Sequence, residues 1–390
     1  MAPNQAIGQL SSQGMNSTLT SAPSDVAIDG RAITLAWSDG KRGEFPFAWL
    51  RDNCACALCR HPGSGQRLLE PSAIPLDIRP RELRFEHDCL QVAWAPDGHA
   101  SAYGGAWLRR CARTRAHEAP RLWDATIAGE LPLAEHQAVV DDPQQLRRWL
   151  EGVDGLGFGV LSGVPVENGE VARVAELFGY VRVTNYGRVF DVRSVVEPAN
   201  LAYTPLGLGP HTDNPYRDPV PSLQLLHCLS SSASGGESTL VDGFCVAEVL
   251  RAKHPADFAV LAGHNVTFAY RDEGAELSAS APIIELDPHG DARAVRFNAR
   301  SLQSPAMPAL ELAAWYDAYL RFARMLEDAR FQVRLRLEPG DLFIVDNRRV
   351  LHGREPYAAS AGGRHLQGCY ADIDGLRSTL AVLARDEADD

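Results

Sequence analysis

Residues 221–244 read PSLQLLHCLSSSASGGESTLVDGF, two short apolar runs separated by a segment rich in serine and glycine. Comparable runs follow as NVTFAYRD at 265–272, FQVRLRL at 331–337, DLFIVDN at 341–347 and RHLQGCYAD at 364–372. Many short strands with few helices between them are typical of a β-sandwich or jelly-roll barrel. We therefore expect a mainly β domain with flanking helices over residues 135–390.

The rest of the chain divides into three parts. Residues 1–24 are rich in Ser, Thr, Gly and Pro and are expected to be a disordered tail. Residues 25–118 contain short alternating segments such as AITLAW and LQVAWA, broken by Asp-Gly turns, which predict a small antiparallel β domain. Residues 119–134 are expected to form a linker to the larger domain.

Composition excludes several classes of protein. The net charge is -12, with 50 acidic and 38 basic residues, whereas a nucleic-acid-binding protein usually has a basic excess. No apolar run approaches the roughly 20 residues that a membrane span requires. The first 24 residues lack the charged and apolar regions of a secretory signal and contain no arginine, so we expect a cytoplasmic protein without nucleic-acid or membrane partners.

A metal-binding pattern begins at His211-Thr212-Asp213 and is completed by His352. Two imidazoles and one carboxylate form the facial triad that holds non-haem Fe(II) and leaves coordination positions open. Arg364 follows the second histidine, and its planar guanidinium is suited to a carboxylate bound through both oxygens. The four residues together predict an iron site that also takes an acidic co-substrate.

A second His-x-Asp pair, His289-Gly290-Asp291, shows that such a pair alone is weak evidence. It lies between the strand-like runs PIIELD and ARAVRFN, where a hairpin turn is expected. Because a turn tip is exposed and poorly organised for metal binding, we favour His211 over His289.

Three of the eight cysteines, Cys54, Cys56 and Cys59, lie within six residues of one another. Cys3His is a common ligand set for structural zinc, and the fourth ligand could be His61 or His99. His99 would join two separate segments of the small domain, whose folding the ion would then stabilise directly. Reduced core thiols are the alternative.

Several longer motifs accompany these residues: WLRDNCAC, HTDNPY, GGESTLVDGF, DNRRVLHGR and RHLQGCYAD. In this combination the chain resembles the γ-butyrobetaine dioxygenase family, within the Fe(II)/2-oxoglutarate-dependent taurine dioxygenase superfamily. The resemblance implies a double-stranded β-helix (jelly-roll) catalytic domain and a small N-terminal zinc-binding β domain. It also implies a homodimer and favours His99 as the fourth zinc ligand.

The resemblance further implies roles for single residues. Iron would be held by His211, Asp213 and His352, and the far carboxylate of 2-oxoglutarate by Arg364, assisted by Ser238 or Thr239. An aromatic cage for a quaternary ammonium group would consist of Tyr186, Phe190, Tyr203 and Tyr370, unless these are ordinary core aromatics. Asn200 would hold the anionic end of the substrate, and Arg300 or Arg217 would add to it if directed inward rather than to the surface.

The function implied is hydroxylation of a trimethylammonium substrate with O2 and 2-oxoglutarate, releasing succinate and CO2. Conversion of γ-butyrobetaine to L-carnitine is the expected reaction. The alternatives are 2-trimethylaminoethylphosphonate or, less favoured, trimethyllysine as substrate. A zinc-containing binding module without catalysis is the alternative outside the enzymes.

Overall fold

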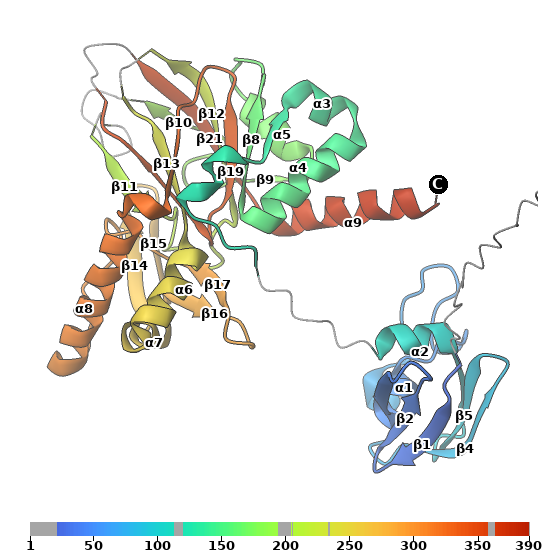
Figure 1. Cartoon of the computed structure of the whole chain (residues 1–390). Coiled ribbons are helices and arrows are strands. Elements are labelled where there is room, and N and C mark those ends of the chain that lie inside the picture. Colours follow the sequence, from blue (N-terminus) through green and yellow to red (C-terminus); the bar gives the residue numbers. More distant parts are fainter. Residues whose placement is uncertain are drawn as a thin grey trace, which may run out of the picture. The chain divides into compact units, whose positions relative to one another are not determined.

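The computed structural model describes residues 22–112, 120–193, 204, 206–232, 235–357 and 363–389. The chain forms two compact units that divide after residue 118, and each unit is described by itself (Figure 1). Residues 1–21 of the expected tail lie outside the described residues. Among the helices described, none has the length and apolar character that crossing a membrane requires.

The first unit contains two three-stranded antiparallel sheets. One consists of β1 (Asp25–Asp29), β2 (Ala32–Ala36) and β3 (Arg42–Pro46), and the other of β4 (Arg79–Glu86), β5 (Cys89–Ala95) and β6 (Ala100–Gly104). The helices α1 (Phe47–Asp52) and α2 (Gly105–Cys111) follow the third strand of each sheet, and the 3-10 turn η1 (Pro71–Ala73) precedes β4. Alternate residues of the strands, among them Ile33, Leu35, Leu90 and Trp94, are buried in one shared core.

The second unit is built around two sheets. The larger has the strand order β10-β21-β12-β19-β8-β7, with β9 also paired to β21, and the smaller has the order β11-β20-β13-β18. The bounds of these strands are β7 Leu133–Glu135, β8 Phe158–Ser162, β9 Val181–Arg182, β10 Phe190–Arg193, β11 Leu208–His211, β12 Leu223–Ser231, β13 Ser238–Asp242, β18 Gln332–Leu335, β19 Leu342–Asp346, β20 Val350–Arg354 and β21 Arg364–Ala371. The mainly β fold with flanking helices expected from residues 221–372 is confirmed.

Helices cover the outer face of each sheet. The larger sheet packs against α4 (Pro143–Leu156), α5 (Glu170–Glu176) and α9 (Ile373–Asp389), with the short α3 (His136–Asp141) beside α4. The smaller sheet packs against α6 (Gly243–Lys253), α7 (Pro255–Gly263) and α8 (Ala309–Leu326), together with the hairpins β14 (Val266–Arg271)–β15 (Glu276–Ala281) and β16 (Ile284–Leu286)–β17 (Ala292–Val295). The space between the sheets is filled by residues that include Phe158, Leu226, Leu240 and Phe343.

The period of two along β12 determines which residues reach the inside of the barrel. Leu223 and Leu225 pack against the helices, whereas Gln224 and Leu226 face the opposite way and border a cavity. Gln224, a polar residue between leucines, is therefore directed into the space between the sheets.

Residues 120–134 differ from the linker expected there. They belong to the second unit and contain the 3-10 turn η2 (Ala125–Gly129) and the start of β7, which pairs in parallel with β8. Trp123 is buried, and its indole N–H donates to the carbonyl of Leu156 at 2.7 Å. Burial of this large ring fixes the segment to the barrel.

Candidate active site

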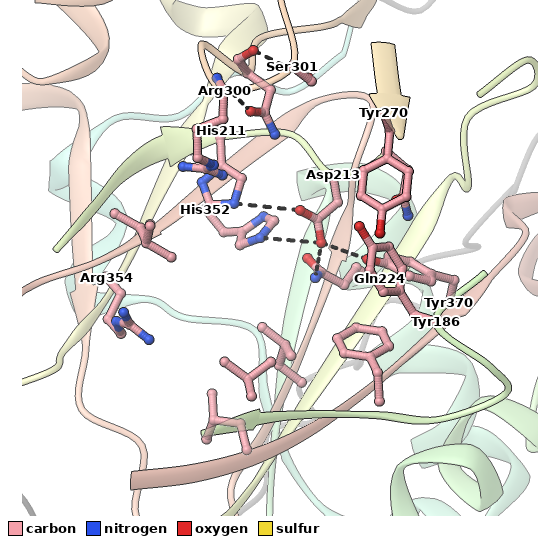
Figure 2. Close-up of a pocket in the computed structure, with 18 of the residues that line it drawn as sticks. Tyr186, His211, Asp213, Gln224, Tyr270, Arg300, Ser301, His352, Arg354 and Tyr370 are labelled. Carbon is pink, nitrogen blue, oxygen red and sulfur yellow. Dashed lines mark hydrogen bonds and ion pairs between the residues drawn. The ribbon is translucent and has the colours of Figure 1, made fainter. Parts of the chain in front are cut away.

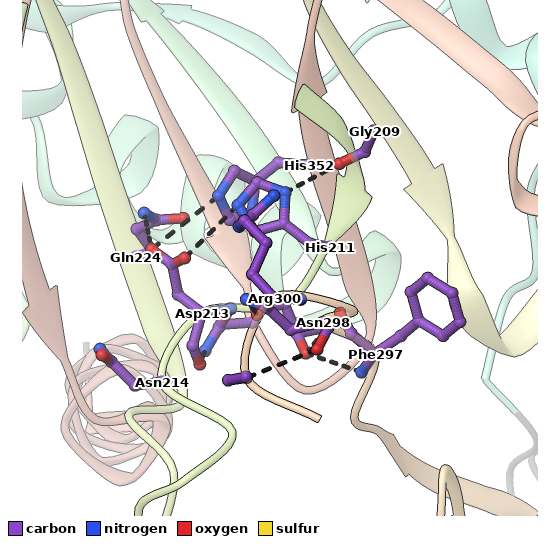
Figure 3. A network of polar contacts seen from close by, with 12 residues as sticks. Gly209, His211, Asp213, Asn214, Gln224, Phe297, Asn298, Arg300 and His352 are labelled. Carbon is purple, nitrogen blue, oxygen red and sulfur yellow. Dashed lines mark hydrogen bonds and ion pairs between the residues drawn. The ribbon is translucent and has the colours of Figure 1, made fainter. Parts of the chain in front are cut away.

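The two candidate iron-binding histidines lie side by side on adjacent strands. His211 ends β11, and His352 is its register partner on β20. Their ring centroids are 4.5 Å apart. The Nε2 atom of His211 lies 3.5 Å from Oδ1 of Asp213, and that of His352 lies 3.9 Å from Oδ2 (Figure 3). The pairing of β11 with β20 therefore gathers the three predicted ligands at one point.

The loop that carries Asp213 is fixed by a buried amide. The backbone N–H of Asp213 donates to Oδ1 of Asn347 at 2.7 Å, and Nδ2 of Asn347 donates to the carbonyls of Asp213 and Pro221. Asn347 is fully buried at the end of β19. Its role was missed in the sequence, although it belongs to the DNRRVLHGR motif.

The histidines are oriented for metal binding through Nε2. The Nδ1 atom of His211 lies 2.9 Å from the carbonyl oxygen of Gly209, which requires the proton on Nδ1 and leaves the Nε2 lone pair free. Burial and the neighbouring His211 lower the pKa of His352 to about 3, so this ring is neutral at physiological pH. Two imidazoles and one carboxylate are the donor set that Fe(II) requires.

A cavity of about 460 Å³ opens beside the triad and has the volume of a small-molecule site (Figure 2). Arg364 borders it from the start of β21 and donates to Oγ of Ser238 at 3.3 Å. Burial and nearby Arg354 lower the pKa of Arg364 to about 10, which still leaves the guanidinium charged at neutral pH. Ser238 borders the cavity, whereas Thr239, the other hydroxyl considered in the sequence, does not.

Aromatic rings form another wall of the cavity, which we call the aromatic box. It contains three predicted residues, Tyr186, Phe190 and Tyr370, and two that were missed, Tyr216 and Tyr270. Adjacent ring centroids are 5.0 to 6.2 Å apart. The fourth predicted ring, Tyr203, and the predicted polar residue Asn200 lie outside the described residues.

The structure distinguishes the two arginines that the sequence left undecided. Arg300 borders the cavity and extends toward the two histidines from a loop held by Asn298, whose Nδ2 donates to the carbonyl of Thr212 (Figures 2 and 3). Arg217 does not border this cavity, and its guanidinium donates to Asn185 instead. A further arginine, Arg354, borders the cavity while binding the carbonyls of Thr204 and Leu206.

The cysteine cluster of the first unit has the geometry of a closed zinc site. The Sγ atoms of Cys54, Cys56 and Cys59 lie 3.3, 3.6 and 3.5 Å from Nε2 of His99. Tetrahedral zinc with ordinary bond lengths places sulfur and nitrogen ligands about 3.5 Å apart, so the four residues fit the ion. His61 is not part of this group, and its Nδ1 accepts from the backbone N–H of Ser64.

Both parts of the chain match models of known protein families. Residues 125–370 match the family model described as taurine catabolism dioxygenase TauD, TfdA family. The chain belongs to this family. Residues 25–120 also match the model described as gamma-butyrobetaine hydroxylase-like, N-terminal.

Three relatives are similar to this chain over nearly its whole length. Gamma-butyrobetaine dioxygenase of Pseudomonas sp. (strain AK-1) is 38% identical and covers 94% of this chain and 97% of its own. The Homo sapiens gamma-butyrobetaine dioxygenase is 30% identical, with 92% and 96% covered. Trimethyllysine dioxygenase of Meyerozyma guilliermondii is 29% identical, with 92% and 94% covered.

Family membership decides the class of chemistry. The protein is an Fe(II)/2-oxoglutarate-dependent dioxygenase, with O2 as co-substrate, and it carries a Cys3His site suited to zinc. The prediction of an enzyme rather than a zinc-containing binding module is confirmed. The pair His289 and Asp291, favoured less in the sequence, lies at the turn between β16 and β17.

Proposed function

We propose that this dioxygenase hydroxylates a small trimethylammonium substrate, and that this substrate is γ-butyrobetaine, which becomes L-carnitine. One C–H bond is replaced by C–OH while O2 and 2-oxoglutarate are converted to the hydroxyl oxygen, succinate and CO2. The observation that carries the proposal is the aromatic box in the same cavity as the iron-binding triad. The similarity to two gamma-butyrobetaine dioxygenases supports it.

The box suits a cation that cannot donate hydrogen bonds. The hydroxyl of Tyr186 is paired with that of Tyr216 at 2.9 Å, and the hydroxyl of Tyr270 donates to Asp272 at 2.6 Å. Because these polar groups are bound to one another, the rings offer mainly their faces to an occupant. A ring face attracts a trimethylammonium group by about 0.5–2 kcal/mol when water is excluded. Several rings around one cation can therefore hold that end of the substrate.

The remaining residues of the cavity hold the co-substrate and the metal. Bound Fe(II) supplies the oxidising chemistry, and His211, Asp213 and His352 would be its ligands. Arg364, supported by Ser238, would bind the far carboxylate of 2-oxoglutarate through a charge-assisted pair. A substrate fixed at the box is then presented to the metal with one methylene in reach, which is how orientation contributes to rate.

Arg300 favours a second candidate substrate of the same class. Its side chain borders the cavity, burial lowers its pKa, and the charge of nearby Asp213 opposes that shift. An arginine can bind a carboxylate or a phosphonate through two parallel hydrogen bonds. The phosphonate counterpart, 2-trimethylaminoethylphosphonate, carries more charge and would gain more from Arg300. Trimethyllysine is supported by the similarity to a trimethyllysine dioxygenase, and no residue of the cavity favours it in particular.

Oxygen consumption and succinate release test these assignments. The substrates to compare are γ-butyrobetaine, its phosphonate counterpart, trimethyllysine, and 5,5-dimethylhexanoate, which has the shape of γ-butyrobetaine without the cation. We expect the highest kcat/KM for γ-butyrobetaine and a large loss with 5,5-dimethylhexanoate, which keeps the carboxylate but lacks the cationic group. Equal turnover of γ-butyrobetaine and 5,5-dimethylhexanoate would refute recognition of the cation in the aromatic box. A preference for the phosphonate that disappears in Arg300→Met would establish the second candidate instead.

We further propose that the enzyme is a homodimer, on the strength of the family resemblance. Light scattering of the zinc-loaded protein tests the dimer: twice the mass of the 390-residue chain supports it, and a single-chain mass contradicts it.

A further inference from the structure

The iron-binding carboxylate has one oxygen already engaged by two side chains. Nε2 of Gln224 donates to Oδ2 of Asp213 at 2.6 Å, and the Tyr370 hydroxyl donates to the same oxygen at 2.8 Å (Figure 2). The other oxygen, Oδ1, lies 3.5 Å from Nε2 of His211. The two oxygens of the carboxylate therefore have different surroundings.

We propose that Gln224 and Tyr370 are positioning residues that hold Asp213 as a ligand through Oδ1 alone. A free carboxylate can rotate and can bind a metal through one or both oxygens. Two donors on Oδ2 oppose that rotation and reserve Oδ1 for the ion, which keeps the remaining coordination positions available for co-substrate and O2. Ligating carboxylates in metal sites are commonly hydrogen-bonded in this way, and the partners contribute to metal affinity.

Both donors are held rigidly by the larger sheet. Gln224 on β12 and Tyr370 on β21 are register partners in adjacent strands, and they are 2% and 3% exposed. The phenolic hydroxyl of Tyr370 carries a hydrogen that it donates to the carboxylate. For Gln224, only the amide nitrogen can face the carboxylate, because its oxygen would be repelled. Sheet pairing thus delivers two obligatory donors to one atom.

The ring and the hydroxyl of Tyr370 have different roles. Its ring stacks on Phe190 with centroids 5.1 Å apart and forms a wall of the aromatic box, while its hydroxyl binds Asp213. A phenylalanine at this position keeps the ring and removes the hydrogen bond. The substitution therefore tests the positioning role apart from the box.

Metal affinity measured without any substrate tests the proposal independently of the proposed function. Mn(II) is titrated into the zinc-loaded, iron-free protein, and free Mn(II) is followed by electron paramagnetic resonance. We expect Tyr370→Phe and Gln224→Met each to raise the Kd for Mn(II) roughly tenfold, the effect typical of removing such a partner. Tyr186→Phe is the matched control, because that hydroxyl binds Tyr216 rather than Asp213, and its Kd should not change.

Two further readings distinguish positioning from general damage. Melting temperature and zinc content should remain close to the parent in all three variants. Unchanged Kd values in both Tyr370→Phe and Gln224→Met would overturn the proposal. It would also be overturned if Tyr186→Phe weakened Mn(II) binding as strongly as they do.

Discussion

Gly368 offers a direct test of the aromatic box because its missing side chain makes room for one ring. It is the register partner of Phe190 across β10 and β21. A Cβ atom built on Gly368 would lie 2.5 Å from Cζ of Phe190 and 2.9 Å from Cδ2 of Leu226. No such contact can persist, so Gly368→Ala must displace the Phe190 ring from its place over the sheet.

The expected cost follows from the loss of one ring from the box. A cation–π contact contributes about 0.5–2 kcal/mol, which corresponds to a roughly 2- to 30-fold loss in kcat/KM. Added volume in a packed site also lowers the free energy of unfolding by about 1–3 kcal/mol. Activity should therefore fall while the protein remains folded at assay temperature.

Steady-state kinetics with γ-butyrobetaine measure the effect. Two control experiments show whether the loss arises from displacement of the Phe190 ring. Gly263→Ala on α7 adds the same methyl group where no heavy atom lies within 4 Å, and it should leave kcat/KM unchanged. On a Phe190→Val background the ring is already absent, so Gly368→Ala should cost much less there. Full activity of Gly368→Ala, or equal losses on both backgrounds, would refute the assigned position of Phe190.

Three other predictions concern separate parts of the molecule. Arg364→Met removes a charge-assisted pair of about 1.5–3 kcal/mol and should raise the KM for 2-oxoglutarate roughly 10- to 100-fold, as succinate assays would show; an unchanged KM contradicts its role. Cys56→Ser removes a ligand of the closed cluster and should lower zinc content and the thermal stability of the first unit, which metal analysis and circular dichroism would detect; full zinc content would exclude the site. Burial lowers the pKa of His227 to about 4, so the unfolded chain binds a proton that the folded one does not as pH falls from 6.5 to 4. The melting temperature should therefore decrease as the pH is lowered through this window, and it should decrease less steeply in His227→Leu. The same dependence of melting temperature on pH in both proteins would contradict this.

The parts of the fold and site that sequence could predict are those set by local pattern. The short apolar runs PSLQLLHCL and DLFIVDN predicted central strands because a strand that is buried on both faces appears in the sequence as a nearly continuous apolar segment. His211, Asp213, His352 and Arg364 were recognisable because few chemistries require that donor set.

Other residues depend on register and on contacts between distant segments, which no local pattern encodes. Tyr270 reaches the cavity from the β14–β15 hairpin, and its neighbour Tyr216 is one of several aromatic residues that spacing alone could not assign. The sequence alone does not distinguish Arg300 from Arg217. Only the folded loops direct Arg300 to the cavity and Arg217 to Asn185. Gln224 did carry a signal, since a single amide in an otherwise apolar stretch of β12 indicates a buried polar partner.

Turnover of γ-butyrobetaine under 18O2 tests the central assignment most directly. The reaction proposed for the triad and the aromatic box predicts one labelled oxygen in the hydroxyl of the product and one in succinate, in equal amounts. It also predicts that neither product forms with Asp213→Ala. Hydroxylated product without the label, succinate formed without hydroxylated product, or undiminished turnover by Asp213→Ala would contradict the account.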